Sequence, residues 1–326
     1  MSYGMDARIG VSFQNSYGTL NTASMHWLQV TNDTVALKKA EIERKGMRGI
    51  YAQGALIEGA NTVGGDVTVE ADGISVGVLL EATMLRTTVT SGSLYTHTFK
   101  ARTADFDTTF SAGKPFTLHK HMGDAGSAQL YSDLNGEQID LDITDGQLLT
   151  AKLGVVGGTY SQIAKIAPTY YTGAPFDWSV TSISLNGSAR LNMQKFAFTF
   201  KNTLSAKHML GEAISFANKY PERIKRTGMQ VCDVSGTFLF DDQTDLQQFI
   251  AQSRQRLTVS LTGAASITSG YNEQIIIDIP ALVITDFPQG VPNAGELAVS
   301  FKGVAEYSVS SGVAFAITLV NTKAGY

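Results

Sequence analysis

Apolar and polar side chains alternate over many short segments of this chain, in the pattern that a half-buried β-strand produces. In the first half these segments are residues 35–43, 66–70, 95–99, 116–119 and 147–153. In the second half they are residues 190–200, 234–240, 257–261, 275–279 and 296–301. The alternation predicts that the segments form strands of antiparallel sheets.

Two segments show helical spacing instead. Residues 72–84 carry Ile74, Val78 and Leu79, and residues 244–254 carry Leu246 and Phe249. Each follows the second strand of its half, so the landmarks of one half return roughly 170 residues later in the same order. The sequence therefore predicts a mainly β protein with two tandem copies of a small antiparallel β-sandwich or barrel, each with one flanking α-helix and a long inter-strand loop.

Length and composition are consistent with two fused domains of one fold. The 326 residues, 43% of them hydrophobic, can bury two separate cores. We predict an N-terminal arm at 1–24, a first domain at 25–165, a linker at 166–177, a second domain at 178–313 and a C-terminal strand or arm at 314–326. We expect the segments at both ends to pack on a neighbouring subunit.

The predicted strands are separated by two unusually long segments, residues 44–64 and 205–230. Connections within compact domains usually have about 4–6 residues. Residues 205–230 combine large apolar side chains with charges, a mixture that suits a subunit interface. We expect both loops to contact other subunits, through the following candidate residues: Arg44, Arg48, Tyr51, Met209, Phe216, Tyr220, Arg223 and Arg226.

Charge and targeting signals exclude several classes of function. The 25 basic and 29 acidic residues leave a net charge of −4, which argues against a surface that grips nucleic acid. The N-terminus lacks a signal pattern, and no apolar run is long enough to span a membrane, so we expect a protein that is made in the cytosol and does not insert into membranes. We expect the single cysteine, Cys232, to be buried, and Asn186–Gly187 to form a tight hairpin turn.

Candidate chemistry is sparse. His119 and His121 would share one face of a strand with Asp124 close behind, which suits zinc or nickel, but a third fixed ligand is not evident. The alternative is that they are strand-end side chains next to a turn. The chain contains no HExxH pair and no phosphate loop. We predict no enzymatic activity, no cofactor and no metal, with a β-rich binding module or hydrolase as the alternative class.

Many short motifs of the chain, in order and spacing, resemble those of the major tail tube proteins of bacteriophages with long, non-contractile (siphovirus-type) tails. In the first half they are QNSYGTLNT at 14–22, GDVTVE at 65–70, GVLLEA at 77–82 and YTHTF at 95–99. In the second half they are PER at 221–223, SGTFLF at 235–240, GVAEY at 303–307 and AITLVNT at 316–322, which resembles the family's closing strand.

The resemblance implies two tube-type folds per chain and trimeric rings with pseudo-sixfold symmetry, stacked head to tail into a hollow tube. The candidate loop residues would then form inter-ring contacts. The expected partners are further copies of the chain, the tape measure, the tail terminator and the distal tail protein. The phage genome would pass through without specific binding, in a virion tail assembled in the host cytoplasm. Another virion ring protein, such as a tail terminator, a distal tail protein or a contractile-system inner tube, is the alternative.

Duplex DNA slides more easily past a mildly acidic bore than past a basic one. The candidate lumen-lining residues are Glu41, Glu43, Asp66 and Glu70, which lie on predicted strands next to the first long loop. The alternative is that each belongs to an ordinary solvated strand face. The predicted strands also carry basic residues that argue against a purely acidic bore: Lys38, Lys39 and Lys195.

Overall fold

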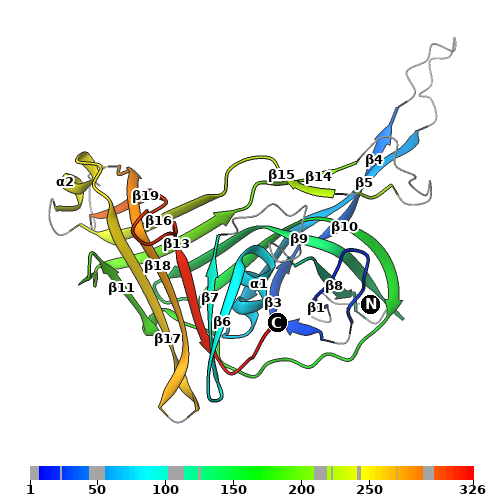
Figure 1. The fold of residues 1–326 in the computed structure, drawn as a ribbon, viewed down its shortest axis with the longest axis horizontal. Helices are drawn as coiled ribbons and strands as arrows, with labels where there is room; N and C mark the ends of the chain where they lie inside the picture. Colours follow the sequence, from blue (N-terminus) through cyan, green and yellow to red (C-terminus); the bar gives the residue numbers. More distant parts are fainter. Residues whose placement is uncertain are drawn as a thin grey trace.

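The computed structural model describes residues 7–22, 24–43, 56–101, 114–123, 126–208, 219–221, 223–240, 244–268, 270–288 and 297–326. These residues form antiparallel strands and two α-helices, so the predicted mainly β class is confirmed. Figure 1 shows the first half of the chain around α1 and the second half at the left, beside α2.

The first half contains β1 to β10 and one helix. Its elements are β1 (Arg8–Phe13), β2 (His26–Leu28), β3 (Val30–Asp33), β4 (Ala36–Ile42), β5 (Ile57–Glu70), α1 (Ser75–Thr83), β6 (Leu85–Ser91), β7 (Leu94–Lys100), β8 (Phe116–His121), β9 (Ser127–Thr144) and β10 (Thr150–Ala164).

The second half contains the remaining strands, one α-helix and a short 3₁₀ turn. Its elements are the 3₁₀ turn Trp178–Val180, β11 (Thr181–Leu185), β12 (Ser188–Ala189), β13 (Met193–Lys201), β14 (Leu204–Lys207), β15 (Arg223–Arg226), β16 (Val231–Leu239), α2 (Thr244–Ile250), β17 (Gln255–Thr268), β18 (Tyr271–Asp286), β19 (Ala298–Ala305) and β20 (Ala316–Asn321).

The two halves pair their strands in the same order. In the first half the neighbours are β1, β8, β9, β10, β5 and β4. In the second half they are β11, β17, β18, β19, β16 and β13. In this order β17 takes the place of β8, while β6 and β7 form an additional hairpin in the first half, so residues 95–99 and 257–261 are not counterparts.

Strand pairing also joins the halves at two places. β9 pairs with β13, and β20 lies between β18 of the second half and β7 of the first. The strands of both terminal segments therefore pair within their own chain, and contact of these segments with a neighbouring subunit stays a prediction. β1 pairs with β2 and β8, and β20 pairs with β7 and β18, because each completes a sheet of its own chain.

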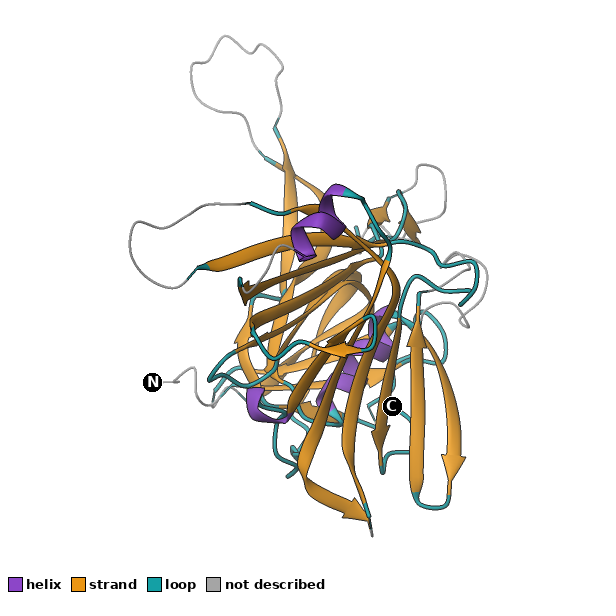
Figure 2. Cartoon of the chain, turned by 90° about the vertical axis from the view of Figure 1, so that its left-hand side faces the viewer, coloured by secondary structure: helices purple, strands orange, loops and turns teal. Residues whose placement is uncertain are grey.

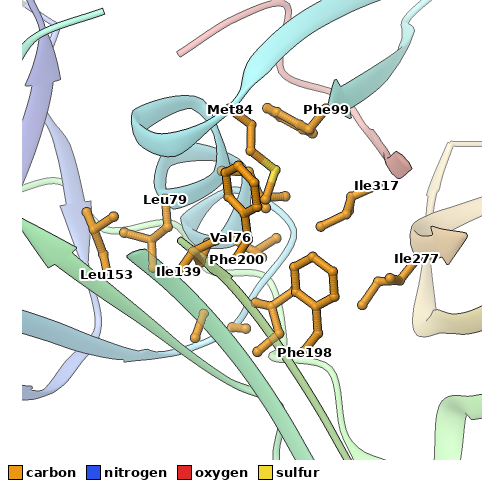
Figure 3. Packing of buried hydrophobic residues seen from close by; sticks show 14 of the residues in the cluster. Val76, Leu79, Met84, Phe99, Ile139, Leu153, Phe198, Phe200, Ile277 and Ile317 are labelled. Atoms are coloured by element: carbon orange, nitrogen blue, oxygen red, sulfur yellow. The ribbon is translucent and has the colours of Figure 1, made fainter. Parts of the chain in front are cut away.

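Buried hydrophobic side chains of both halves form one contiguous core rather than the two separate cores expected. Figure 3 shows Leu79 of α1 and Met84, which follows the helix, near Phe198 and Phe200 of β13, with Ile277 of β18 on the far side. The alternation of β13 produces this arrangement, because every second residue faces the core. The linker region contributes as well, since Phe176 is buried and its backbone N–H donates to the Ala71 carbonyl.

The two long segments predicted to be loops are partly strands. β5 begins at Ile57, so residues 57–64 extend an antiparallel hairpin with β4, which we call the first arm. β14, which begins at Leu204, pairs with β15, and the two strands form the second arm. In Figure 1 the first arm projects away from the body, and the second runs along the same side of the molecule. Two-stranded pairing satisfies backbone groups that a loop would leave to water.

Two local expectations are confirmed, the turn at Asn186–Gly187 and the burial of Cys232. Asn186 and Gly187 both have positive φ and connect β11 to β12 as a tight turn. Cys232 is buried in β16, and burial raises the pKa of its thiol well above the usual range. Figure 2 shows α2 above the strands of the second half. Of the helices in the described ranges, none is long and apolar enough to cross a membrane.

Candidate functional surface

One face of the central strands covers the core, and the other carries polar side chains. The strands in question are β5, β10, β9, β13, β16 and β19, which lie side by side across both halves. We call their outward side the polar face. Its polar residues are Asp66, Thr68, Glu70, Gln138, Asp140, Asp142, Thr144, Thr150, Lys152, Lys195, Thr199, Lys201, Asp233, Ser235, Thr237, Ser300 and Lys302. The register also places the apolar residues Ala197, Val231, Leu239, Ala298 and Val304 on this side.

Strand register sets these side chains in rows across the sheet. One row consists of Thr68, Lys152, Asp140, Thr199 and Asp233, each opposite the next on a neighbouring strand. Directly opposed side chains on one face lie about 4.5–5.5 Å apart at Cβ, close enough to interact. The row crosses from the first half to the second between Asp140 and Thr199, so the polar face is continuous across the junction.

Ion pairs hold some of these charges in place. Lys152 lies 3.0 Å from Asp140, and its hydrogen bond to that carboxylate raises the pKa of the lysine. Lys195 of β13 lies 3.0 Å from Asp142 of β9, so this pair links the two halves. Exposed pairs of this kind contribute about 0–1 kcal/mol each to stability. Their main effect is therefore on the charge pattern, in which lysines and carboxylates are interleaved.

The polar face is hollowed at two places. The first depression lies over the junction of the halves and is lined by Thr68, Gln138, Asp140, Leu141, Asp142, Thr150, Lys152, Ala197, Thr199, Lys201 and Asp233. The second lies over the strands of the second half and is lined by Lys195, Ser235, Gly236, Thr237, Asp286, Pro288, Ser300, Phe301 and Lys302. Both are open troughs on the sheet surface, with charged groups of both signs along them.

The four predicted lumen carboxylates fall into two separate places. Asp66 and Glu70 lie on the polar face. Glu41 lies on the first arm opposite Glu58, and Glu43 follows the end of β4. Along β5, residue 58 is 12 residues from residue 70, or about 40 Å at the rise of an extended strand. The structure therefore does not bring the four carboxylates together.

Sequence reasoning missed most charges of the polar face. Asp140 and Asp142 lie on β9, which the sequence analysis did not identify as a strand. The alternation of residues 139–143, with apolar side chains at odd positions and aspartates at even ones, was the available signal. Further missed charges are Lys152, Lys201, Asp233 and Lys302.

The candidate inter-ring residues are only partly visible. Arg44, Arg48, Tyr51, Met209 and Phe216 lie outside the described residues. Of the remaining candidates, Arg223 and Arg226 lie on the second arm and Tyr220 lies just before it. The Tyr220 hydroxyl donates to the Tyr160 carbonyl at 3.5 Å, Arg223 pairs with Lys207, and Arg226 pairs with Leu204.

The second arm rests on the first half of the same chain. Leu204 and Ile224 form a small buried cluster with Val156 of β10. Farther along, a ring nitrogen of His208 lies 3.0 Å from the Asn61 carbonyl of β5, and Lys219 donates to the Glu58 carbonyl. The arm thus crosses from the second half onto β10 and β5.

The two histidines considered for metal binding are core residues. His119 and His121 are buried, with ring centroids 4.7 Å apart and both edges against Trp27. Burial lowers both pKa values, that of His121 to about 4. Asp124 lies outside the described residues. Among the residues that are described, no three potential ligands cluster around a common point.

These features define a mainly β protein whose exposed elements include a broad polar sheet face and two arms. The chain belongs to the phage tail tube protein family, whose sequence pattern it matches over residues 4–310. It is therefore a structural component of the virion tail that assembles with copies of itself and with other tail proteins into a tube. A search of curated proteins finds none that matches.

Proposed function

We propose that this chain is the major tail tube subunit of a long, non-contractile tail. Rings of the chain stack into a hollow tube, and the phage genome passes through the bore into the host. The observation that carries this proposal is the polar face, which runs without interruption across six neighbouring strands and both halves. Such a surface suits a water-filled channel wall, since it offers no large apolar patch to a passing polymer.

Ring symmetry follows from the internal repetition. The shared strand order of the halves supports a tandem duplication of one tube fold. Three chains then supply six similar wedges, which gives a trimeric ring with pseudo-sixfold symmetry. A heterologous contact whose rotation closes makes the ring, and a second heterologous contact along the axis makes the stack.

The charge pattern suits passage of DNA without binding. Phosphate backbones are held by clusters of lysine and arginine that displace counterions. On the polar face each of Lys152 and Lys195 is paired with an aspartate at 3.0 Å. The lysines therefore offer duplex DNA less free positive charge than their number indicates, and the bore does not retain the genome.

A tube subunit does not need to catalyse a reaction, so we propose that the protein is not an enzyme and has no cofactor. Its partners in the tail would be the tape measure, the tail terminator and the distal tail protein, and assembly would take place in the host cytoplasm. A subunit of this kind must expose contact surfaces on its sides and along its axis, and we propose that the two arms provide part of them.

Negative-stain electron microscopy of the purified protein tests the proposal. We expect striated rods of constant diameter, with native mass spectrometry of short assemblies giving multiples of three chains. Single rings that never extend would favour a tail terminator or distal tail protein instead. Discrete monomers under all conditions would contradict the tube role and favour a binding module. Six chains per ring would refute the trimer while leaving the tube role intact.

A further inference from the structure

Inside the chain, the halves meet through a strand edge and an arm that crosses it. The C-terminal part of β9 pairs with β13, beginning with Gln138 opposite Lys201. Above this contact, Leu204 at the base of the second arm packs against Val156 of β10. This internal junction shows how one half can attach to the next.

The β9 side of the junction has a counterpart at the end of β18. β9 makes its last pair with β8 at Leu134 and reaches Gln138 four residues later. β18 makes its last pair with β17 at Leu282 and reaches Asp286 four residues later. Each strand is also paired with the strand that follows it, β10 or β19. Asp286 therefore holds the position of Gln138.

The β13 side of the junction has its counterpart in β4. Lys201 pairs with Val231, eight residues before the end of β16, from 231 to 239. Lys38 pairs with Thr62, eight residues before the end of β5, from 62 to 70. α1 and α2 each begin five residues after those strand ends, which supports the same alignment. Lys38 therefore holds the position of Lys201.

Both counterpart edges are free in the isolated chain. Among the described residues, β3 and β4 pair with β5 alone, so their outer edge has no strand partner. Val283 to Asp286 pair with β19 on one side, and the described strands leave their other side open. Such an edge presents unpaired N–H and C=O groups to another strand. Lys38 and Asp286 also carry opposite charges, which are favourable when directly opposed on one face.

The first arm lacks a contact that the second arm makes. Ile42 pairs with Ile57, thirteen residues before the end of β5, and Leu204 pairs with Arg226, thirteen before the end of β16. Leu204 is 6% exposed on Val156, whereas Ile42 is 56% exposed. The difference indicates that the first arm lacks the neighbour on which the second arm rests.

By the same register, the counterpart of Val156 on the missing neighbour is Val304 of β19. Val156 pairs with Gly64 of β5, and Val304 pairs with Asp233 of β16. Both partners lie six residues before the ends of their strands, from 64 to 70 and from 233 to 239.

We infer that copies of this chain join side by side by repeating the internal junction. The outer edge of β4 of one copy pairs with the end of β18 of the next, with Lys38 opposite Asp286. The first arm then crosses onto the neighbour, and Ile42 packs against its Val304. The inference rests on the proposed ring assembly and specifies the contact that closes the ring.

Disulfide trapping tests the register. Directly opposed residues of antiparallel strands have Cα atoms about 4.5–5.5 Å apart, within the range that a disulfide bridges. The variant K38C/D286C, assembled and then oxidised, should give covalent dimers and trimers on a non-reducing gel. Peptide mapping should find the bond between the two introduced cysteines. The native Cys232 is buried and does not compete.

Two further cysteine pairs serve as controls. K201C/Q138C lies at the internal junction and should close within one chain, leaving a monomer band. A36C/D286C is displaced by two residues along the same face and should cross-link at least tenfold less. Equal trapping of the displaced pair would overturn the proposed register.

The outcomes separate this inference from the proposed function. If wild-type protein forms tubes and K201C/Q138C closes, but K38C/D286C does not cross-link, the edge contact is wrong and the tube role stands. If the wild type forms no tubes, the tube role is contradicted, and covalent oligomers of K38C/D286C would still support the edge contact. If the wild type forms no tubes and K38C/D286C does not cross-link, both the tube role and the edge contact are wrong.

A surface variant tests the arm without relying on cysteines. Ile42→Asp should leave a folded, soluble chain with an unchanged melting temperature, because the side chain is exposed in the isolated subunit. It should abolish ring formation. Val89→Asp, at an apolar site on β6 that is 69% exposed and lies outside the proposed contact, should assemble normally. Normal tubes from Ile42→Asp would contradict the arm contact.

Discussion

The two halves share a strand order, but their helices differ in how deeply they are buried. All nine residues of α1 are buried, and Gly77 lies directly beneath the ring of Tyr326 and the side chain of Leu319. α2 packs through Phe249 on Phe287, with ring centroids 5.8 Å apart, and leaves Ile250 63% exposed. One topology can thus use the same helix as a core element or as a surface element.

The covering elements explain the difference. The hairpin of β6 and β7 follows α1 directly, and β20 pairs with β7, so strands and the C-terminal Tyr326 close over α1. After α2 the chain enters β17 within four residues, 251–254, and leaves no room for such a hairpin. The packing of both halves and of the closing strand, β20, is therefore concentrated around α1 in the first half.

The largest expected effect comes from removing a core contact of α1. Leu79→Ala should lower the free energy of unfolding by about 2–5 kcal/mol, because Leu79 is fully buried and its loss leaves a cavity. The matched change on the other helix, Ile250→Ala, should stay within about 0.5 kcal/mol. Urea denaturation of both variants measures the contrast. Equal losses would show that α2 is as much a core element as α1.

Histidine burial gives a second contrast between the halves. His26, His97, His119 and His121 lie in the first half, and burial lowers the pKa of each, to about 4 for His26 and His121. In the unfolded chain these groups bind a proton near pH 6.5. The stability due to the neutral folded form is therefore fully present above pH 6.5 and is lost as pH falls toward 4.

For His121 alone we expect a loss of about 1–3 kcal/mol between pH 6.5 and 4. Trp27, which contacts the ring of His121, reports on unfolding of this region by fluorescence in a Trp178→Phe background. His121→Phe should flatten the pH dependence of the urea midpoint. An unchanged slope in that variant would mean that His121 is protonated at similar pH in both states.

Much of the strand content could be predicted from the alternation of apolar and polar residues. Two strand segments could not, the middle of β9 and the start of β5. β9 passes through Asp133-Leu-Asn-Gly136, which is typical of a turn, and Asp133 has a φ of 58°. The strand continues because β10 pairs with it on both sides of this segment, from Ser127 to Asp142. The polar, Gly-rich start of β5 likewise resembled a loop, and only pairing with β4 makes it an arm.

The polar face, too, could be predicted only in part from the local sequence. Asp66 and Glu70 could be predicted because they sit in a clean alternating segment next to Val67 and Val69. Their grouping with Asp140 and Asp233 depends on pairing between residues far apart in the chain, which local pattern does not encode. The separation of Glu41 from Glu70 follows from the length of β5, which the sequence analysis divided between a loop and a strand.

The smallest effect on stability, and the sharpest test of the polar face, concerns a difference in charge between the halves. Counting back from the ends of β5 and β16, Asp66 and Glu70 correspond to Ser235 and Leu239, so the first half carries carboxylates where the second half carries none. Replacing Asp66 and Glu70 by lysine should change the free energy of unfolding by no more than about 0.5 kcal/mol per site and leave ring assembly intact.

If the polar face lines the bore, those lysines attract a duplex that carries one charge about every 1.7 Å, over a range of about 8 Å at physiological salt. Genome ejection from tails built with the Asp66→Lys/Glu70→Lys variant should be slowed. Ser235→Lys should slow it less, because it adds a lysine without removing a carboxylate. The matching change on the first arm, Glu41→Lys/Glu43→Lys, should leave ejection unaffected, since these carboxylates lie about 40 Å from Glu70 along β5. Normal tails with wild-type ejection kinetics from Asp66→Lys/Glu70→Lys would show that the DNA path lies elsewhere.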